Sequence, residues 1–209
     1  MKRIELIIIA ALLFVGFIVI FLPNTEPFKH VIGEKELLYE TNKEGRYIST
    51  DEVAKAIIES DPSILVIDLR TPYEYNHYTI EGAINIPYAK IMDDANADYL
   101  DQDVYTTVLF SNGTSLADQA WVRLRSYDYK GNKVLKGGLN EWYKTIINPR
   151  KPRDIDPITV TEQYQFRKGA SIYFTGVQDG VQGSSSSSKP KSKKPIVRRK
   201  KKAVSGGCG

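Results

Sequence analysis

The side chains best suited to chemistry in this 209-residue chain are few and lie far apart in the sequence. The one cysteine, Cys208, is the next-to-last residue, so no disulfide can form within the chain. One cysteine with two histidines, His30 and His77, cannot supply a Cys/His zinc site, and we expect neither a metal nor a cofactor. Hydroxyl groups gather instead in the segment 111–115, directly after the apolar run 108–110. Serine is a weak nucleophile without a neighbouring base, and neither histidine is obviously placed to act as one.

The segments around these hydroxyls alternate between strand and helix patterns. Ser49 and Glu52 fit a capping box, followed by apolar residues at helical spacing through Ile58. Short apolar runs rich in β-branched residues predict strands that are buried on both faces. Strands that alternate with helices predict an α/β fold with a parallel sheet flanked by helices. The strands are expected at residues 64–67, 108–110 and 132–135, and a helix carrying Leu139, Trp142 and Ile146 is expected after Gly137 and Gly138.

An uninterrupted apolar segment, Leu6–Leu22, follows Lys2 and Arg3 near the N-terminus. At about 1.5 Å per residue, it reaches roughly 25 Å as a helix, near the short end of what spans a bilayer. A cleaved signal peptide is the alternative, but residues 23–26 offer no small-x-small cleavage site. We expect residues 1–22 to be an uncleaved, single-pass membrane anchor. The positive-inside rule then favours a domain on the non-cytoplasmic side, periplasmic or extracellular.

The rest of the chain divides by composition. Residues 23–46 are polar and mixed, and are interpreted as a spacer, whereas residues 47–147 carry the strand and helix patterns. Residues 148–179 begin with a proline-rich connector and continue into a helix over residues 161–174, whose aromatic side chains we expect to pack on the domain. Residues 180–209 are rich in serine and then in lysine and arginine, which predicts a disordered tail.

The basic charge of the chain belongs to this tail. Nine of the 29 lysines and arginines lie in residues 189–202, and removing them leaves 20 bases against 25 acids. The net charge of +4 is therefore no reason to expect specific nucleic-acid binding. The tail is most simply interpreted as a solvated, flexible arm. Its alternative role is contact with anionic lipid headgroups or another polyanion, at about 1 kcal/mol for each cation near such a surface.

Three segments, in order, resemble the rhodanese-like family of single-domain sulfurtransferases. The first contains Asp68-Leu69-Arg70, Glu74-Tyr75 and the run 80–87, and the second is the strand, loop and helix that begin at Val108. The third, residues 135–142, is similar to the family's closing L-x-G-G-x-x-x-W. The resemblance covers residues 47–147 and implies the parallel sheet of that family. The motif residues expected to be structural are Asp68, Arg70, Glu74, Gly82, Gly137, Gly138 and Trp142.

The resemblance also implies what the loop after Val108 does. In this family a cysteine at this point carries sulfur as a persulfide, inside a cradle of backbone N–H groups at a helix N-terminus, which stabilises the thiolate. Ser111 falls at the cysteine position, and a hydroxyl cannot hold a transferable sulfur atom. Tyr78 and Thr79 also replace the family's Gly-His pair. We therefore expect a domain that is catalytically inactive at this loop.

Two main interpretations of the loop remain open, with Ser111 as a covalent nucleophile a distant third. In the first, the loop is a structural remnant in which Ser115 caps the next helix and Asp118 completes the capping pattern. In the second, the loop binds a sulfur oxyanion or phosphate without a covalent bond, assisted by its hydroxyls. The candidate residues for this site are Ser111, Asn112, Gly113, Thr114, Ser115 and Leu116.

Two classes of function follow from the sequence. The leading hypothesis is a membrane-anchored, inactive rhodanese-like domain that binds a small anion or a partner protein. The alternative is a sulfurtransferase or sulfur carrier that uses Cys208. About 30 flexible residues span roughly 30 Å on average, which would let this thiol reach the loop.

Overall fold

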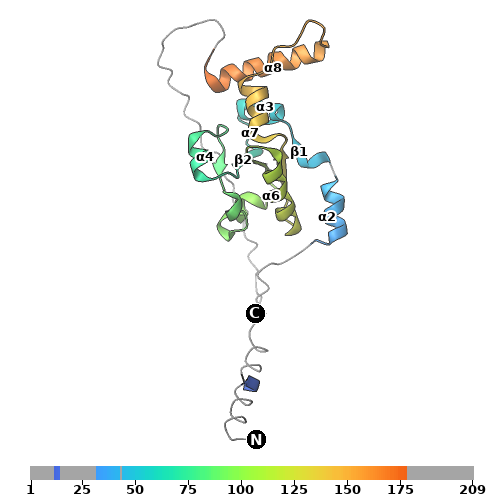
Figure 1. Ribbon diagram of the computed structural model, residues 1–209, viewed down its shortest axis with the longest axis vertical. Helices are drawn as coiled ribbons and strands as arrows, with labels where there is room; N and C mark the ends of the chain where they lie inside the picture. The colour runs from blue at the N-terminus through green and yellow to red at the C-terminus, as the bar shows by residue number, and fades with distance from the viewer. Residues whose placement is uncertain (1–11, 15–31, 43, 178–209) are drawn as a thin grey trace, which may run out of the picture.

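The computed structural model describes residues 12–14, 32–42 and 44–177 (Figure 1). Most of the expected anchor at residues 1–22 lies outside the described residues, as do His30, Cys208 and the expected tail at residues 180–209. In the described part of the chain, no helix combines the length and the apolar character needed to cross a bilayer.

The centre of the domain is a five-stranded parallel sheet with the order β1-β5-β4-β2-β3. This confirms the expected α/β fold with a parallel sheet flanked by helices. The predicted strands correspond to β2, β4 and β5, whereas β1 and β3 have only two residues each and gave no strand pattern of their own. The strands are β1 Tyr47–Ile48, β2 Ile64–Asp68, β3 Ile84–Asn85, β4 Thr106–Phe110 and β5 Asn132–Leu135.

Helices cover both faces of this sheet (Figure 1). The α-helices are α2 Glu34–Thr41, α3 Thr50–Ile58, α4 Pro72–His77, α5 Ala97–Leu100, α6 Thr114–Ser126, α7 Gly138–Trp142 and α8 Ile158–Thr175. Short 3₁₀ turns are η1 Glu44–Arg46, η2 Tyr88–Lys90 and η3 Asp94–Asn96, and the π-helical turn η4 Tyr143–Ile147 continues α7.

Side chains on β4 alternate between two cores, as the two-residue period of a strand requires. Val108 and Phe110 pack with residues of α3, α7 and η4 on one face, and Leu109 packs with residues of α6 on the other. All three are 0% exposed, so the central strand is buried on both faces. This double burial explains why the strand appears in the sequence as a continuous apolar run.

The N-terminus of α3 has the predicted capping box. The Ser49 hydroxyl accepts a hydrogen bond from the Glu52 backbone N–H at 3.2 Å, and the Glu52 carboxylate accepts one from the Ser49 N–H at 2.8 Å. The hydrogen bond from the Ser49 hydroxyl also lowers the pKa of Glu52. We expect Ser49→Ala to reduce the free energy of unfolding by about 1 kcal/mol, because the first turn of α3 loses its cap. Urea unfolding of the full chain in detergent micelles measures this loss, and an unchanged midpoint would contradict it.

Two regions outside the sheet differ in detail from the sequence expectation. The segment interpreted as a spacer contains α2, whose Glu40 lies 4.0 Å from Arg125 of α6. In α8, Phe174 packs edge-on against Trp142 with ring centroids 5.1 Å apart, as expected for an aromatic that packs on the domain. Tyr173 contacts Phe174 edge-on, with ring centroids 5.0 Å apart, but is 45% exposed, and Phe166 is 37% exposed.

Candidate functional site

The candidate loop lies at the carboxyl edge of the sheet, where parallel strands bring their following residues together. Ser111 comes directly after β4, and Arg70 and Gly137 come two residues after the ends of β2 and β5. β4 lies between β2 and β5, so the three following segments are neighbours at one edge of the sheet.

Backbone hydrogen bonds connect the candidate loop, residues 111–113, to the start of α7. The Ser111 carbonyl accepts from the Leu139 N–H at 2.8 Å, and the Asn112 carbonyl accepts from the Asn140 N–H at 3.0 Å. Gly138 makes this contact possible, because a Cβ added there would lie 2.5 Å from the Ser111 carbonyl oxygen and 2.8 Å from that of Gly113. The expected structural role of Gly138 therefore has a defined cause, which is the close approach of two backbone segments.

Peptide planarity determines where the N–H groups of the loop point. In a trans peptide, the carbonyl of one residue and the N–H of the next point in opposite directions. Since the carbonyls of Ser111 and Asn112 face α7, the N–H groups of Asn112 and Gly113 face away from it. The Gly113 carbonyl accepts from the Ser111 hydroxyl at 2.8 Å, which turns the Thr114 N–H away from that hydroxyl. In the described part of the chain, none of these three N–H groups donates to a backbone carbonyl outside its own helix or strand.

The N-terminus of α6 differs from the expectation. The prediction that Ser115 caps this helix is wrong, because α6 begins at Thr114 and Gly113 occupies the N-cap position without a side-chain hydrogen bond. The Thr114 hydroxyl, which could have competed for a local cap, instead accepts from the Gly137 N–H at 2.8 Å. Asp118 does not complete a capping pattern either; it lies 3.5 Å from Arg46. The first turn of α6 thus lacks a side-chain cap.

Ser111 is poorly placed for covalent chemistry. Its side chain is only 4% exposed, and its hydroxyl donates to the Gly113 carbonyl rather than to a base. His77, the histidine within the described residues, is exposed at the end of α4, with its ring 4.5 Å from that of Tyr73. A Ser–His pair is therefore not formed in the described part of the chain.

Asp68 and Arg70 form a buried ion pair beside the loop. The Arg70 guanidinium donates to Asp68 from Nη2 at 2.6 Å and from Nε at 3.0 Å, and the two side chains are 7% and 0% exposed. Arg70 also donates to the Tyr78 carbonyl at 2.6 Å and to the Asn112 side chain at 3.2 Å. Thr79 donates its hydroxyl to Asp68 at 2.9 Å. This network joins the end of β2 to the candidate loop.

Glu74 supports the same loop from α4. Its carboxylate accepts from the Thr71 hydroxyl at 2.7 Å and from the Asn112 amide at 3.0 Å, and these hydrogen bonds, that of Thr71 first, lower the pKa of Glu74. A lowered pKa in the folded state means that this support is complete above the ordinary pKa of glutamate and is lost as the pH falls through the folded value. Asn112 is therefore held by both Arg70 and Glu74.

An open groove of about 670 Å³ runs beside the N-terminus of α6. Of the six candidate loop residues, Thr114 and Ser115 line it. Sequence analysis missed the other lining residues, although several recur on α6 three or four positions apart and so share one face of the helix. Its lining is completed by Tyr88, Asp118, Gln119, Val122 and Arg123.

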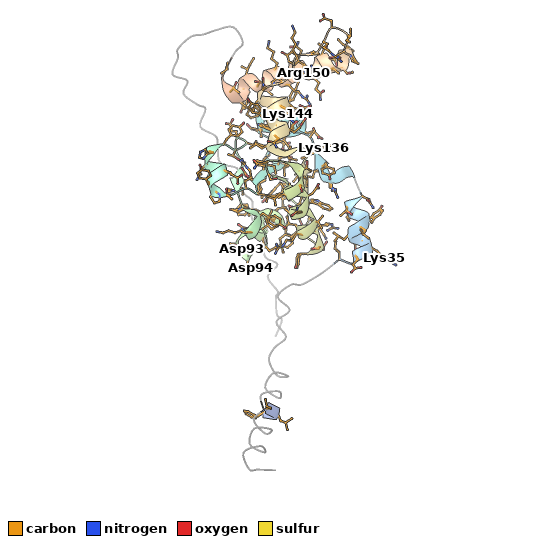
Figure 2. All side chains as sticks on the ribbon, viewed as in Figure 1. Lys35, Asp93, Asp94, Lys136, Lys144 and Arg150 are labelled. Atoms are coloured by element: carbon orange, nitrogen blue, oxygen red, sulfur yellow. The ribbon has the colours of Figure 1, made fainter. Side chains whose placement is uncertain are left out.

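The charge around the groove favours an anionic ligand over a cationic one. The groove's carboxylate, Asp118, is already engaged, because it lies 3.5 Å from Arg46 and accepts a hydrogen bond from the Tyr47 hydroxyl at 3.1 Å. Arg123 remains as a cation on the same wall. Figure 2 shows Lys136, Lys144 and Arg150 in the half of the domain that holds α7 and α8, and Lys35, Asp93 and Asp94 in the other half. No group of three or more potential metal ligands occurs among the described residues.

The remaining motif residues have structural surroundings. Trp142 is 1% exposed in the core. Burial raises the pKa of Tyr78. Gly82 has a φ of +78°, a conformation that side chains other than that of glycine rarely adopt.

Comparison with known proteins gives the family of this part of the chain. Residues 49–145 match the model of the rhodanese-like domain family, so the chain contains a rhodanese-like domain, a fold used by sulfurtransferases and sulfur carriers. A similar curated protein is an uncharacterized protein of Synechocystis, 28% identical over 121 residues. The match covers 57% of this chain and 64% of that protein, so the chain spans less than two thirds of the relative's length.

Two of the solved structures found by comparison each match about half of this chain. The rhodanese-like domain of an Anabaena protein is 24% identical, with a TM-score of 0.43, over 54% of this chain and 88% of that one. A single-domain sulfurtransferase of Saccharomyces cerevisiae is 21% identical, with a TM-score of 0.40, over 48% of this chain and 90% of that one.

Proposed function

We propose that this chain is a membrane-anchored rhodanese-like domain that binds a small oxyanion noncovalently at the N-terminus of α6 and does not transfer sulfur from this loop. The observation that carries the proposal is the direction of the loop amides. The carbonyls of residues 111 and 112 are held by α7, so the following N–H groups face away from it, next to a helix whose first turn has no side-chain cap.

This arrangement suits an anion for electrostatic reasons. The aligned peptide dipoles of a helix place roughly half a positive charge at its N-terminus, where free N–H groups can donate to oxyanions. Ser115 adds a hydroxyl in the same turn of α6, and Gln119 and Arg123 lie farther along the helix on the wall of the same groove. Sulfate, thiosulfate and phosphate share the required chemistry, since each presents several oxygen acceptors around a compact negative charge.

The absence of sulfur transfer at the loop follows from the atom at position 111. A persulfide needs a sulfur nucleophile, and the oxygen of Ser111 cannot form one. The buried hydroxyl also faces the Gly113 carbonyl, which would repel an anion formed on that side chain. The loop amides therefore have a role in binding that does not require the Ser111 side chain to react.

The proposal predicts that Ser115→Asp abolishes anion binding. A carboxylate in the first turn of α6 would occupy the amides itself and repel an incoming anion, which we expect to weaken binding at least 30-fold, about 2 kcal/mol. The same carboxylate would leave the fold intact, because an acid is favourable at a helix N-terminus. Calorimetric titration of the full chain in detergent micelles with thiosulfate, sulfate and phosphate measures the affinity.

Ser126→Asp is the matched control, because it adds the same charge at the far end of α6 and should leave the affinity unchanged. If the unsubstituted chain gives no heat with any of the three anions, the loop is a structural remnant. Equal binding by the Ser115→Asp and Ser126→Asp variants would mean that the anion sits elsewhere.

Membrane attachment is the second part of the proposal and rests on the apolar run Leu6–Leu22 with Lys2 and Arg3 before it. We infer a single span with the domain on the non-cytoplasmic side. Protease added to intact cells should then cut the C-terminal tail. Tail protection in intact cells, with cleavage only after lysis, would place the domain in the cytoplasm.

A further inference from the structure

The groove beside α6 is much larger than an inorganic anion. Its volume is about 670 Å³, and its lining includes Thr114 and Ser115 in the first turn of α6 and Arg123 in the last turn. Arg123 comes eight positions after Ser115, which is roughly 12 Å along the axis of an α-helix. Cavities of about 300–1,000 Å³ usually hold organic molecules, whereas an anion with four oxygens needs only a few times the roughly 30 Å³ of a water molecule. An inorganic anion at the first turn would therefore fill only one end of the groove.

Arg123 places a cation that has no partner toward the far end of this groove. In the part of the chain that the structure describes, no hydrogen bond or ion pair holds its guanidinium. Arg125, two positions on, differs because it donates to Asp128 at 2.8 Å. Long side chains of a helix lean toward its N-terminus, so the Arg123 guanidinium can extend along the groove toward the first turn of α6.

The carboxylate in the lining does not cancel this charge. The charged residues that line the groove are Asp118 and Arg123. Asp118 lies 3.5 Å from the Arg46 guanidinium and accepts a hydrogen bond from the Tyr47 hydroxyl at 3.1 Å. Since Arg46 balances the charge of Asp118, the positive charge of Arg123 is left over for a ligand.

Apolar side chains line both walls of the groove. Val122 of α6 and Tyr88 of η2 are partly buried and pack against the core on this face of the sheet. Tyr88 belongs to the wall opposite α6, and its N–H donates to the carbonyl of Leu69, just beyond β2, at 2.9 Å. The groove thus offers apolar contact as well as the amides of its first turn and the cation of Arg123.

We propose that the ligand of this site is a small organic molecule in which an apolar group joins the oxyanion to a second anionic group that pairs with Arg123. This inference rests on the proposed function, because it assigns the oxyanion to the loop amides. The apolar group then lies against Val122 and Tyr88. A carboxylate suits the other end, since the planar fork of a guanidinium matches two carboxylate oxygens.

Three phosphate compounds test this assignment one part at a time. Inorganic phosphate supplies only the oxyanion, phenyl phosphate adds an aromatic ring, and 4-carboxyphenyl phosphate adds the second anionic group. In calorimetric titration of the full chain in detergent micelles, we expect phenyl phosphate to bind about tenfold more tightly than phosphate, because the ring covers apolar surface. The carboxylate should add about another fivefold, as expected for a partly exposed ion pair of good geometry.

Arg123→Gln should remove the second gain, so that phenyl phosphate and 4-carboxyphenyl phosphate bind equally. The ratio of the two affinities is the measured quantity, because it is insensitive to an effect that the substitution has on both ligands. The unfolding midpoint should not change, since the Arg123 guanidinium has no partner within the described residues. Arg125→Gln is the matched control, because it removes the same charge two positions away and should keep the fivefold ratio.

The possible outcomes separate this inference from the proposed function. If inorganic phosphate and the two aryl phosphates bind with equal affinity, the site takes the oxyanion alone, which overturns the inference and leaves the proposed function standing. A carboxylate gain that persists in the Arg123→Gln variant would also overturn it, because the second anionic group would then lie elsewhere. If none of the three compounds binds, and thiosulfate and sulfate do not bind either, both proposals fail together.

Discussion

Gly138→Ala is expected to lower the free energy of unfolding by about 2–5 kcal/mol and to abolish anion binding at the loop. Two effects add at this position. A residue with a Cβ costs roughly 1–2 kcal/mol in the left-handed region, and the φ of Gly138 is +58°. The new Cβ would also lie 2.5 Å and 2.8 Å from two loop carbonyls, and such overpacking typically costs about 1–3 kcal/mol.

The chain provides a control that separates these two effects. Gly82 has a φ of +78°, but a Cβ added there would meet no atom within 4 Å. Gly82→Ala should therefore show only the backbone cost of roughly 1–2 kcal/mol and retain anion binding. Urea unfolding of both variants, with calorimetric titration of each, makes the comparison. If the two variants lose equal free energy of unfolding and both still bind the anion, the contact between α7 and the loop does not shape the site.

Arg70→Leu is the other substitution with a large expected effect, and should lower the free energy of unfolding by about 3–5 kcal/mol. It would leave Asp68, which is 0% exposed, without the guanidinium that donates to both of its carboxylate oxygens. An uncompensated buried charge accounts for most of this cost. The Asn112 side chain would also lose its contact with Arg70, so the loop should bind the anion more weakly.

Arg153→Leu is the matched control for charge loss. Arg153 pairs with Asp156 at 2.9 Å but is 69% exposed, so removing it should cost less than about 1 kcal/mol. Chemical unfolding at neutral pH measures both variants. A cost for Arg70→Leu as small as that for Arg153→Leu would contradict a structural role for the buried pair.

The parts of the fold that the sequence predicts are those determined locally. The Ser49–Glu52 capping box spans four residues, and the run 64–67 is apolar because β2 is buried on both faces. Neither pattern depends on distant partners, so both could be predicted without coordinates. Strands β1 and β3 have only two residues each and exist because longer neighbours pair with them, which no local pattern reveals.

The candidate site was predicted less completely because its geometry depends on contacts between distant segments. The segment 111–116 was correctly located at the junction of a strand and a helix, but its last three residues belong to α6, whose start was misplaced because the Thr114 hydroxyl bonds to Gly137, 23 residues away. Tyr88 and Arg123 could not be assigned to one groove, since η2 and α6 come together only in the folded domain. Likewise, the helix pattern of α8 did not show which of its aromatics would remain exposed.

The most direct test of the central claim is a thiosulfate:cyanide sulfurtransferase assay on the full chain, with the Cys208→Ser variant in parallel. We predict that thiosulfate binds but that neither protein forms thiocyanate above the uncatalysed rate, because position 111 offers an oxygen where sulfur transfer needs a thiolate. Thiocyanate production by the unsubstituted chain that disappears in the Cys208→Ser variant would contradict the account and identify Cys208 as the sulfur carrier.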